Sequence, residues 1–228
     1  MSFKSIQKLS VARTLSTGSS RRVGAEPARC FVARAWLALK RFDCIADQTA
    51  VGNKMSAGRL HMHSACGLLD ADFRSPSLDY IDLIKASRHL CKSPAAGQLQ
   101  FRRAIFNLLA SNQDDHSKNW AFLQSDDGQW QPAPFYDVTY SPHPFNEHAT
   151  AFGGYGKAPP MKVMQKLAAS AGFTNWTKAQ QVVEEVSEVL SQFAHLARQQ
   201  GISNATVSAL NKTLNQRRQE NAAFFSQG

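Results

Sequence analysis

The stretch that decides the fold is FRRAIFNLLASNQDDHSKNWAFL, residues 101–123 of a 228-residue chain. Its first part carries apolar side chains at the spacing of one helix face, namely Phe101, Ile105, Leu108 and Leu109. This period predicts a helix from Gln98 to Ser111. Residues 112–119 are then all polar, which exceeds what a solvated turn needs, before the apolar pattern resumes at Trp120. A polar loop between two buried elements is a common place for a functional site.

The segment after this loop predicts a β-hairpin. An apolar run at 120–123 is followed by Asp126-Asp127-Gly128 and then by Trp130. An Asp-Gly pair between two strand-like runs favours a tight hairpin turn. A hairpin returns the chain to where it began, so Asp137, 23 residues after Asp114, is expected to lie beside the polar loop.

The chain on either side of this centre is mainly helical by its apolar period. One helix is expected from Asp79 to Leu90, with Ser77 as its N-cap. Three more helices are expected to close the chain: Pro159 to Ala171 with Gly172 after its end, Thr177 (in a capping box with Gln180) to Gly201, and one carrying Val207, Leu210 and Leu214. Their apolar stripes are expected to pack on one another as a core.

The first 60 residues differ in composition from the rest. Residues 1–24 predict a flexible start, 26–35 a short helix, 36–42 a strand and 43–60 a loop. This quarter holds 11 of the 26 basic residues and 3 of the 17 acidic ones, a net charge of +8 against +1 for the remainder. Two interpretations stay open for it: a solvated basic arm, and a contact with nucleic acid.

Composition narrows the class of protein. Hydrophobic residues make up 43% and charged residues 19% of the chain, which fits a globular protein and excludes collagen-like and coiled-coil chains. No run approaches the ~18 apolar residues of a membrane span. The cysteines are Cys30, Cys44, Cys66 and Cys91. They form no C-x-x-C pair, and scattered thiols predict a reducing, cytoplasmic location.

The residue types of the polar loop suit phosphoryl transfer. One aspartate, Asp114 or Asp137, could orient a substrate hydroxyl and accept its proton. The other aspartate and an asparagine could hold Mg²⁺ against the phosphates. Lys118 could neutralise charge on the transferred group. Two aspartates and an Asn on adjacent loops therefore predict a kinase-type site.

These residues resemble a known family. FNLL at 106–109, DDHSKN at 114–119 and PFYD at 134–137 are similar to the catalytic core of the HipA-like serine/threonine protein kinases. Four further segments agree, at 41–43, 59–63, 78–80 and 153–157, so the resemblance runs roughly from Trp36 to Asn221. It implies a mainly α fold: a protein-kinase-like C-lobe, a helical bundle with a small β-hairpin at the active site.

The resemblance also implies a role for each matching residue. Asp114 would be the catalytic aspartate, and Asn119 and Asp137 would be the ligands of Mg²⁺. The nucleotide site would contain both of these ligands and Lys40, Arg41, Phe42, His116, Ser117, Lys118 and Tyr136. Of these, residues 40–42 would form the hinge that meets the adenine of ATP, and residues 116–118 would line its phosphate side. The reaction implied is transfer of the ATP γ-phosphoryl group to a protein hydroxyl.

The family's N-lobe is largely missing from this sequence. A phosphate-covering loop, a strand lysine and a helix glutamate should precede the hinge, and they need well over the 35 residues present there. Residues 16–20 and Glu26 are the only remnants proposed, and Lys40 is not taken as the strand lysine. We therefore expect a basic segment at 1–35, a C-lobe with its hinge at 36–228, and weakened kinase activity.

Other functions stay open beside the kinase. The chain could be an inactive module that docks a small DNA-binding antitoxin, with DNA reached through that partner, because HipA-like proteins often work in toxin–antitoxin pairs. It could also be a metal-dependent nuclease that uses Asp114, His116 and Asp137. For the kinase, the resemblance implies a protein substrate such as a component of translation, and no membrane partner.

Overall fold

The computed structural model describes residues 30–33, 36–39, 41–46, 57–75 and 77–225. Its helices are α2 (Ala65–Leu68), α3 (Tyr80–Leu90), α4 (Pro94–Ala110), α5 (Met161–Ser170), α6 (Trp176–Ser191), α7 (Phe193–Gln199) and α8 (Asn204–Glu220), with 3-10 turns η1 (Ser117–Asn119) and η2 (Ala222–Phe224). Its strands are β1 (Cys30–Ala33), β2 (Trp36–Leu39), β3 (Cys44–Ala46), β4 (Ala57–Arg59), β5 (His61–Ser64), β6 (Leu78–Asp79), β7 (Ala121–Gln124), β8 (Trp130–Pro132) and β9 (Thr150–Ala151). The expected mainly helical fold holds only in part, because small sheets accompany the helices.

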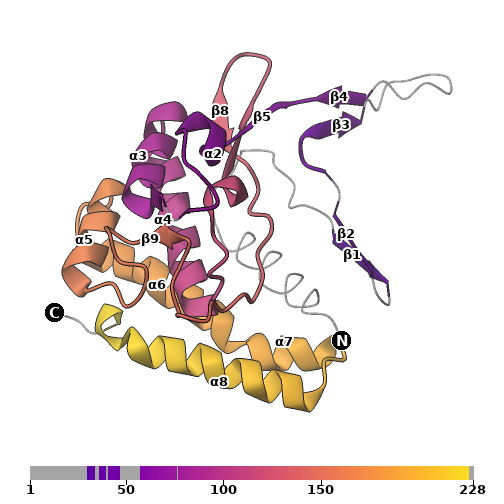
Figure 1. Cartoon of the computed structure of the whole chain (residues 1–228), viewed down its shortest axis with the longest axis vertical. Coiled ribbons are helices and arrows are strands. Elements are labelled where there is room, and N and C mark those ends of the chain that lie inside the picture. Colours follow the sequence, from indigo (N-terminus) through magenta and orange to yellow (C-terminus); the bar gives the residue numbers. More distant parts are fainter. Residues whose placement is uncertain (1–29, 34–35, 40, 47–56, 76, 226–228) are drawn as a thin grey trace.

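Helix α4 is the centre of the body. It packs against α3, α5, α6 and α8, and Figure 1 shows it surrounded by them. Its Phe101 and Ile105 side chains have no solvent exposure. Burial of one such side chain stabilises the fold by about 1.5–3 kcal/mol, so the apolar period of the sequence is used here as expected. The C-terminal end of this rigid helix delivers the chain into the polar loop.

The helices predicted from residue 79 onward form, but two of them begin with a different cap. The Asp79 side chain accepts a hydrogen bond from Ile81 N at 2.8 Å and so caps α3, whereas the Ser77 hydroxyl donates to the Asp72 carbonyl. Asn175 caps α6, which puts Thr177 inside the first turn. In α3 a carboxylate closer to the helix than Ser77 takes the capping position, and in α6 an amide directly before the first turn does. The expected helix up to Gly201 is also divided, because α6 ends at Ser191 and α7 begins at Phe193, with Gln192 between them.

The predicted hairpin is present and belongs to a three-stranded sheet. β7 pairs antiparallel with β8, with Leu123 opposite Gln131, and Gly128 adopts a φ of +79° in the turn. The other edge of β7 pairs with β5, from His61 opposite Gln124 to Ser64 opposite Ala121. The sheet order is β5-β7-β8. The strand that follows the polar loop is therefore paired on both sides.

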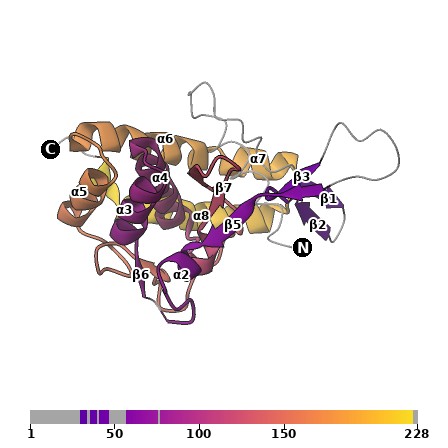
Figure 2. The ribbon, with the colours of Figure 1, turned by 90° about the horizontal axis from the view of Figure 1, so that it is seen from above.

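The N-terminal expectations are partly wrong. Residues 30–33 form strand β1, paired with β2, where a helix over 26–35 was expected. Residues 43–60 contain the β3–β4 pair in place of a plain loop. A short apolar run has no reliable period, and pairing with a neighbour decides its state. Both hairpins extend away from the helical body in Figures 1 and 2. Residues 16–20 and Glu26 lie outside the described residues.

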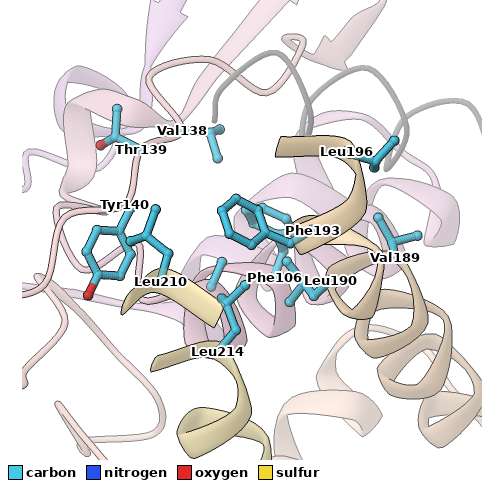
Figure 3. Close-up of a pocket in the computed structure, with 11 residues that line it drawn as sticks. Phe106, Val138, Thr139, Tyr140, Val189, Leu190, Phe193, Leu196, Leu210 and Leu214 are labelled. Atoms are coloured by element: carbon cyan, nitrogen blue, oxygen red, sulfur yellow. The ribbon is translucent and has the colours of Figure 1, made fainter. Parts of the chain in front are cut away.

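A second, smaller apolar cluster joins α7 and α8, and a cavity of about 40 Å³ lies between it and α4. Figure 3 shows the side chains that point into this cavity, with Val138 among them. Its walls are almost entirely hydrocarbon: Phe106, Leu190, Phe193, Leu196, Leu210 and Leu214 are six of them. Among the described residues of this lining, only Thr139 and Tyr140 have polar side chains, so the lining is poorly suited to a phosphate or a metal ion. The side chains suited to phosphoryl transfer therefore lie in the polar loop and not in this cavity.

Candidate functional site

The polar loop begins with a sharp turn at the end of α4. Ser111 adopts the left-handed conformation, with φ +54° and ψ +39°, and ends the helix. The loop backbone is then held from outside. Gln113 N donates to the Ser141 carbonyl at 3.2 Å, and Ala149 N donates to the Gln113 carbonyl at 3.1 Å. Residues 111–114 are thus fixed between two later segments of the chain.

Asp114 presents its carboxylate to solvent at the middle of this loop. Its side chain is 63% exposed, and Oδ1 lies 3.7 Å from His116 Nε2. Its backbone is nevertheless held, because Asp114 N donates to Ser141 Oγ and the Asp114 carbonyl accepts from Asn119 Nδ2 at 2.8 Å. An exposed acidic side chain on an ordered backbone is suited to accept a proton from a bound hydroxyl.

The second acidic position, Asp137, lies next to the same loop. The Tyr136 hydroxyl donates to the Lys118 carbonyl at 2.5 Å, so the residues preceding Asp137 and Asn119 touch. Burial and the neighbouring Asp137 charge raise the pKa of Tyr136 to about 12, which keeps this hydroxyl a donor at neutral pH. Asp137 itself has a φ of +54° and is exposed, whereas Val138 is buried. The turn therefore leaves Asp137 exposed, one residue beyond the Tyr136–Lys118 contact that joins the two segments.

A buried arginine supports this second segment from below. Arg103 Nη2 donates to the Ala133 carbonyl at 2.7 Å, and the guanidinium carbon lies 5.1 Å from the centre of the Phe135 ring. Burial lowers the pKa of Arg103 to about 10, so it is still a cation at neutral pH. This role of Arg103 could not be predicted from the sequence, because an arginine on the buried face of a helix has no periodic signal.

His116, Ser117 and Lys118 have different surroundings. Lys118 is exposed, and its Nζ lies 3.2 Å from the centre of the Phe73 ring. His116 meets the same ring edge-on, with 6.0 Å between ring centres. Ser117 is 2% exposed and its hydroxyl donates to the Ala71 carbonyl at 3.1 Å, so this hydroxyl holds the loop and does not face a solvent-open phosphate site. Of His116, Ser117 and Lys118, only Lys118 is exposed at the surface.

One residue of the expected hinge, Phe42, lies at the site. The Phe42 ring lies 5.6 Å from the Tyr136 ring, between centres, and packs with Leu60 on the small cluster under β7 and β8. Arg41 forms a bidentate pair with Asp43, with Nε 2.8 Å from Oδ1. Lys40 lies outside the described residues. Phe42 therefore lies against Tyr136, the residue that precedes Asp137.

The residue that sequence reasoning missed is Asp115. It is 1% exposed, although it follows the exposed Asp114 directly. Its carboxylate accepts hydrogen bonds from Tyr80, His148 and the backbone of Thr150. Polar groups buried in a protein are normally paired in this way. Only the doubled aspartate in the sequence hinted at two different roles.

Oxygen ligands for a metal ion are present, but they are few. Within the described ranges, no group of three or more His, Cys, Asp or Glu side chains could hold a metal ion. Asn119 and Asp137 offer an amide and a carboxylate oxygen, which are ligand types that Mg²⁺ accepts. Mg²⁺ is often held by one or two carboxylates and completed by water and substrate phosphates. The residues present fit that kind of site.

Comparison with known proteins places this chain in a family. The model of the HipA-like C-terminal domain matches residues 14–195, which is most of the chain, so the protein belongs to that family. The match begins upstream of Trp36, where the resemblance in the sequence began. Across the ranges that the structure describes, no helix is long and apolar enough to cross a bilayer.

Two relatives are informative. Residues of this chain are 43% identical over 49 positions to the serine/threonine-protein kinase toxin HipA of Shewanella oneidensis, covering 21% of this chain and 11% of that protein. The fold is similar to a chain of the Shewanella oneidensis MR-1 complex of HipA, HipB and operator DNA, with a TM-score of 0.59 and 16% identity. That alignment covers 99% of this chain and 57% of the other. This chain therefore spans little more than half the length of the structural relative.

Proposed function

We propose that this chain is a HipA-like serine/threonine protein kinase that transfers the γ-phosphoryl group of ATP to a protein hydroxyl. The observation that carries the proposal is the exposed Asp114 carboxylate on a fixed backbone, with Asn119 and Asp137 on adjoining turns. Family membership and the kinase relative support it. Phosphoryl transfer requires positioning and charge stabilisation more than covalent chemistry from the protein, and this loop supplies both.

Each residue has a defined task in this proposal. Asp114 accepts the proton of the substrate hydroxyl and orients its oxygen toward the phosphorus atom. Asn119 and Asp137 hold Mg²⁺, which would neutralise charge on the phosphates when bound. Lys118 leaves the Phe73 ring to pair with a phosphate oxygen, and Phe42 borders the adenine side. Proton transfer of this kind typically contributes a factor of 10² to 10⁴ in rate.

The decisive experiment combines binding and transfer. Calorimetry should show that Mg²⁺ tightens ATP binding, and autophosphorylation should fall at least 100-fold in Asp114→Asn. Asp126→Asn, an exposed aspartate in the hairpin turn, is the matched control and should leave both unchanged. Transfer that survives Asp114→Asn would contradict the assignment. ATP binding without any transfer would instead indicate an inactive docking module.

The partners follow from the structural relative and belong to the same proposal. That relative is in a complex with HipB and operator DNA. We infer that this chain binds a small DNA-binding antitoxin and approaches DNA through it. A short helix-turn-helix gene beside the gene for this chain would provide the protein to test. Co-elution of the two chains, and retention of operator DNA only when both are present, is the expected result.

A further inference from the structure

A chain of buried hydrogen bonds runs beneath the two acidic loops. It starts at Asp115, which is adjacent to Asp114. Tyr80 donates from its hydroxyl to Asp115 Oδ2 at 2.5 Å and accepts from Asn107 Nδ2 at 2.8 Å. Asn107 Oδ1 in turn accepts from Asn112 Nδ2 at 2.8 Å. The chain of contacts thus passes from the loop, through α3 and α4, and back to the start of the loop.

The far end of this chain reaches the segment that follows Asp137. Asn112 Oδ1 accepts from Ser141 Oγ at 3.0 Å and from Thr139 N at 3.4 Å. Thr139 is two residues from Asp137, and Ser141 Oγ also accepts from Asp114 N at 3.3 Å. Every bond in the series lies between groups on different segments. The position of one acidic loop is therefore tied to the position of the other.

Asp115, at one end of this series of hydrogen bonds, has four further polar contacts. His148 Nδ1 lies 2.9 Å from Oδ2, Thr150 N donates to Oδ1 at 3.2 Å, and Thr150 Oγ1 donates to the Asp115 carbonyl at 2.5 Å. Trp120 Nε1 donates to the same carbonyl at 3.0 Å. A buried carboxylate is tolerated only when its oxygens are paired. Asp115 therefore cannot shift without breaking several bonds at once.

The Tyr80 hydroxyl can act only as the link between these parts. Burial and the charge of Asp115 raise the pKa of Tyr80 well above its usual value, so the hydroxyl stays protonated. It donates its one proton to Asp115 and offers a lone pair to Asn107. Its ring packs separately, 5.5 Å from Trp120 and 4.6 Å from Phe152 between centres. Removing the Tyr80 hydroxyl oxygen alone would break both of these hydrogen bonds and leave the ring contacts in place.

We propose that Tyr80, Asn107, Asn112 and Asp115 are positioning residues that set the relative placement of Asp114 and Asp137. This inference rests on the kinase function proposed above. None of the four has a direct part in the transfer proposed above. They act by fixing two turns whose exposed carboxylates must meet one nucleotide and its Mg²⁺. Removing groups that orient metal ligands typically costs a factor of 10 to 100 in metal affinity or activity.

The test compares Tyr80→Phe with Ser87→Ala. Both remove one buried hydroxyl from α3, but Ser87 donates only to the Leu83 carbonyl within its helix. Tyr80→Phe should weaken ATP binding in the presence of Mg²⁺ about 10-fold and leave binding without Mg²⁺ unchanged. Hydrogen exchange should accelerate about tenfold at both residues 112–119 and residues 137–141. Ser87→Ala should change none of these quantities.

A second variant guards against a general loss of folding. Ser141→Ala removes the hydrogen bond at the opposite end of the same series, at a partly exposed position. It should also weaken Mg²⁺-dependent ATP binding and accelerate hydrogen exchange in both loops, at a lower cost in thermal stability. The inference is overturned if Tyr80→Phe behaves like Ser87→Ala, or if only residues 112–119 exchange faster. If the wild-type chain binds ATP no better with Mg²⁺, the kinase proposal fails, and the exchange pattern alone still decides whether the two loops are coupled.

Discussion

The body around α4 and the loop layer beside it are held together by different forces. In the body, Phe101, Ile105 and Leu167 are fully buried and contact other hydrocarbon. In the loop layer, residues 111–119 and 135–152 add a few side chains such as Phe135 and Val138 to that core, but their polar groups are joined by hydrogen bonds between segments far apart in the chain. Stability in the body therefore depends on filled apolar volume, whereas the placement of the turns in the loop layer depends on single polar atoms.

The largest expected effect is in the body. Phe101→Ala should lower the free energy of unfolding by about 3–5 kcal/mol, because it removes a fully buried ring and leaves a cavity. Urea unfolding measures this loss. Phe145→Ala is the control, since that ring is 71% exposed and its loss should cost less than about 0.5 kcal/mol. Equal losses in the two variants would contradict the position of the core.

The two neighbouring aspartates give the next largest effect. Asp115→Asn should cost about 2–4 kcal/mol in unfolding free energy, because an amide replaces the carboxylate that accepts from Tyr80 and His148. Asp114→Asn should change it by less than about 0.5 kcal/mol, since the Asp114 side chain is mostly exposed. Thermal unfolding of both proteins checks this. A reversal of the order would show that the loop faces the other way.

A smaller effect, of opposite sign, is expected at the apolar cavity. Ala110→Val adds two methyl groups to a wall of this cavity of about 40 Å³. Filling such a space typically stabilises a fold by about 0.5–2 kcal/mol, although the lower β-branched helix propensity offsets a few tenths. Chemical unfolding against Ala95→Val, at an exposed position of the same helix, isolates the filling. Destabilisation in both variants would show that the cavity cannot accept the side chain.

The smallest effect is one of pH. Burial raises the pKa of Cys91 to about 11, above the ordinary value of a thiol. A raised pKa means that the folded state keeps its proton longer than the unfolded state, so this contribution to stability is present below about pH 9 and is lost as the pH rises toward 11. Alkylation of Cys91 should accelerate about tenfold per pH unit up to pH 11. A plateau near pH 9 would contradict the burial.

The two regions also differ in how far the sequence predicts them. The spacing of apolar residues in α3, α4, α6 and α8 indicates which face of each helix is buried. The helices of the body could therefore be predicted from the sequence alone. The Asp-Gly turn located the hairpin in the same way. Strand β1 was misread because four apolar residues carry no period. The failures concentrate where pairing with a distant segment decides the local state.

Only part of the site could be predicted from the sequence. Asp114, Asn119 and Asp137 stand out as residue types in a polar loop, and the structure brings Lys118 into contact with Tyr136, next to Asp137. The supports were not readable, because Tyr80 looks like one more apolar helix position and His148 like one more surface histidine. Their partner Asp115 lies 35 and 33 residues away. Periodicity reports faces of one element and carries no information on such pairs.

The contacts of Asp115 also set an order of events during synthesis. Its partners on either side, Tyr80 and Thr150, are 70 positions apart, and the loop between them cannot close until Thr150 has been made. At a translation rate of roughly 5–20 residues per second, the ribosome needs seconds to add the 35 residues that follow Asp115. During that time Asp114 and Asp115 lie in a segment that lacks its contacts with Thr150. The two aspartates therefore reach their final positions only after most of the chain has been translated.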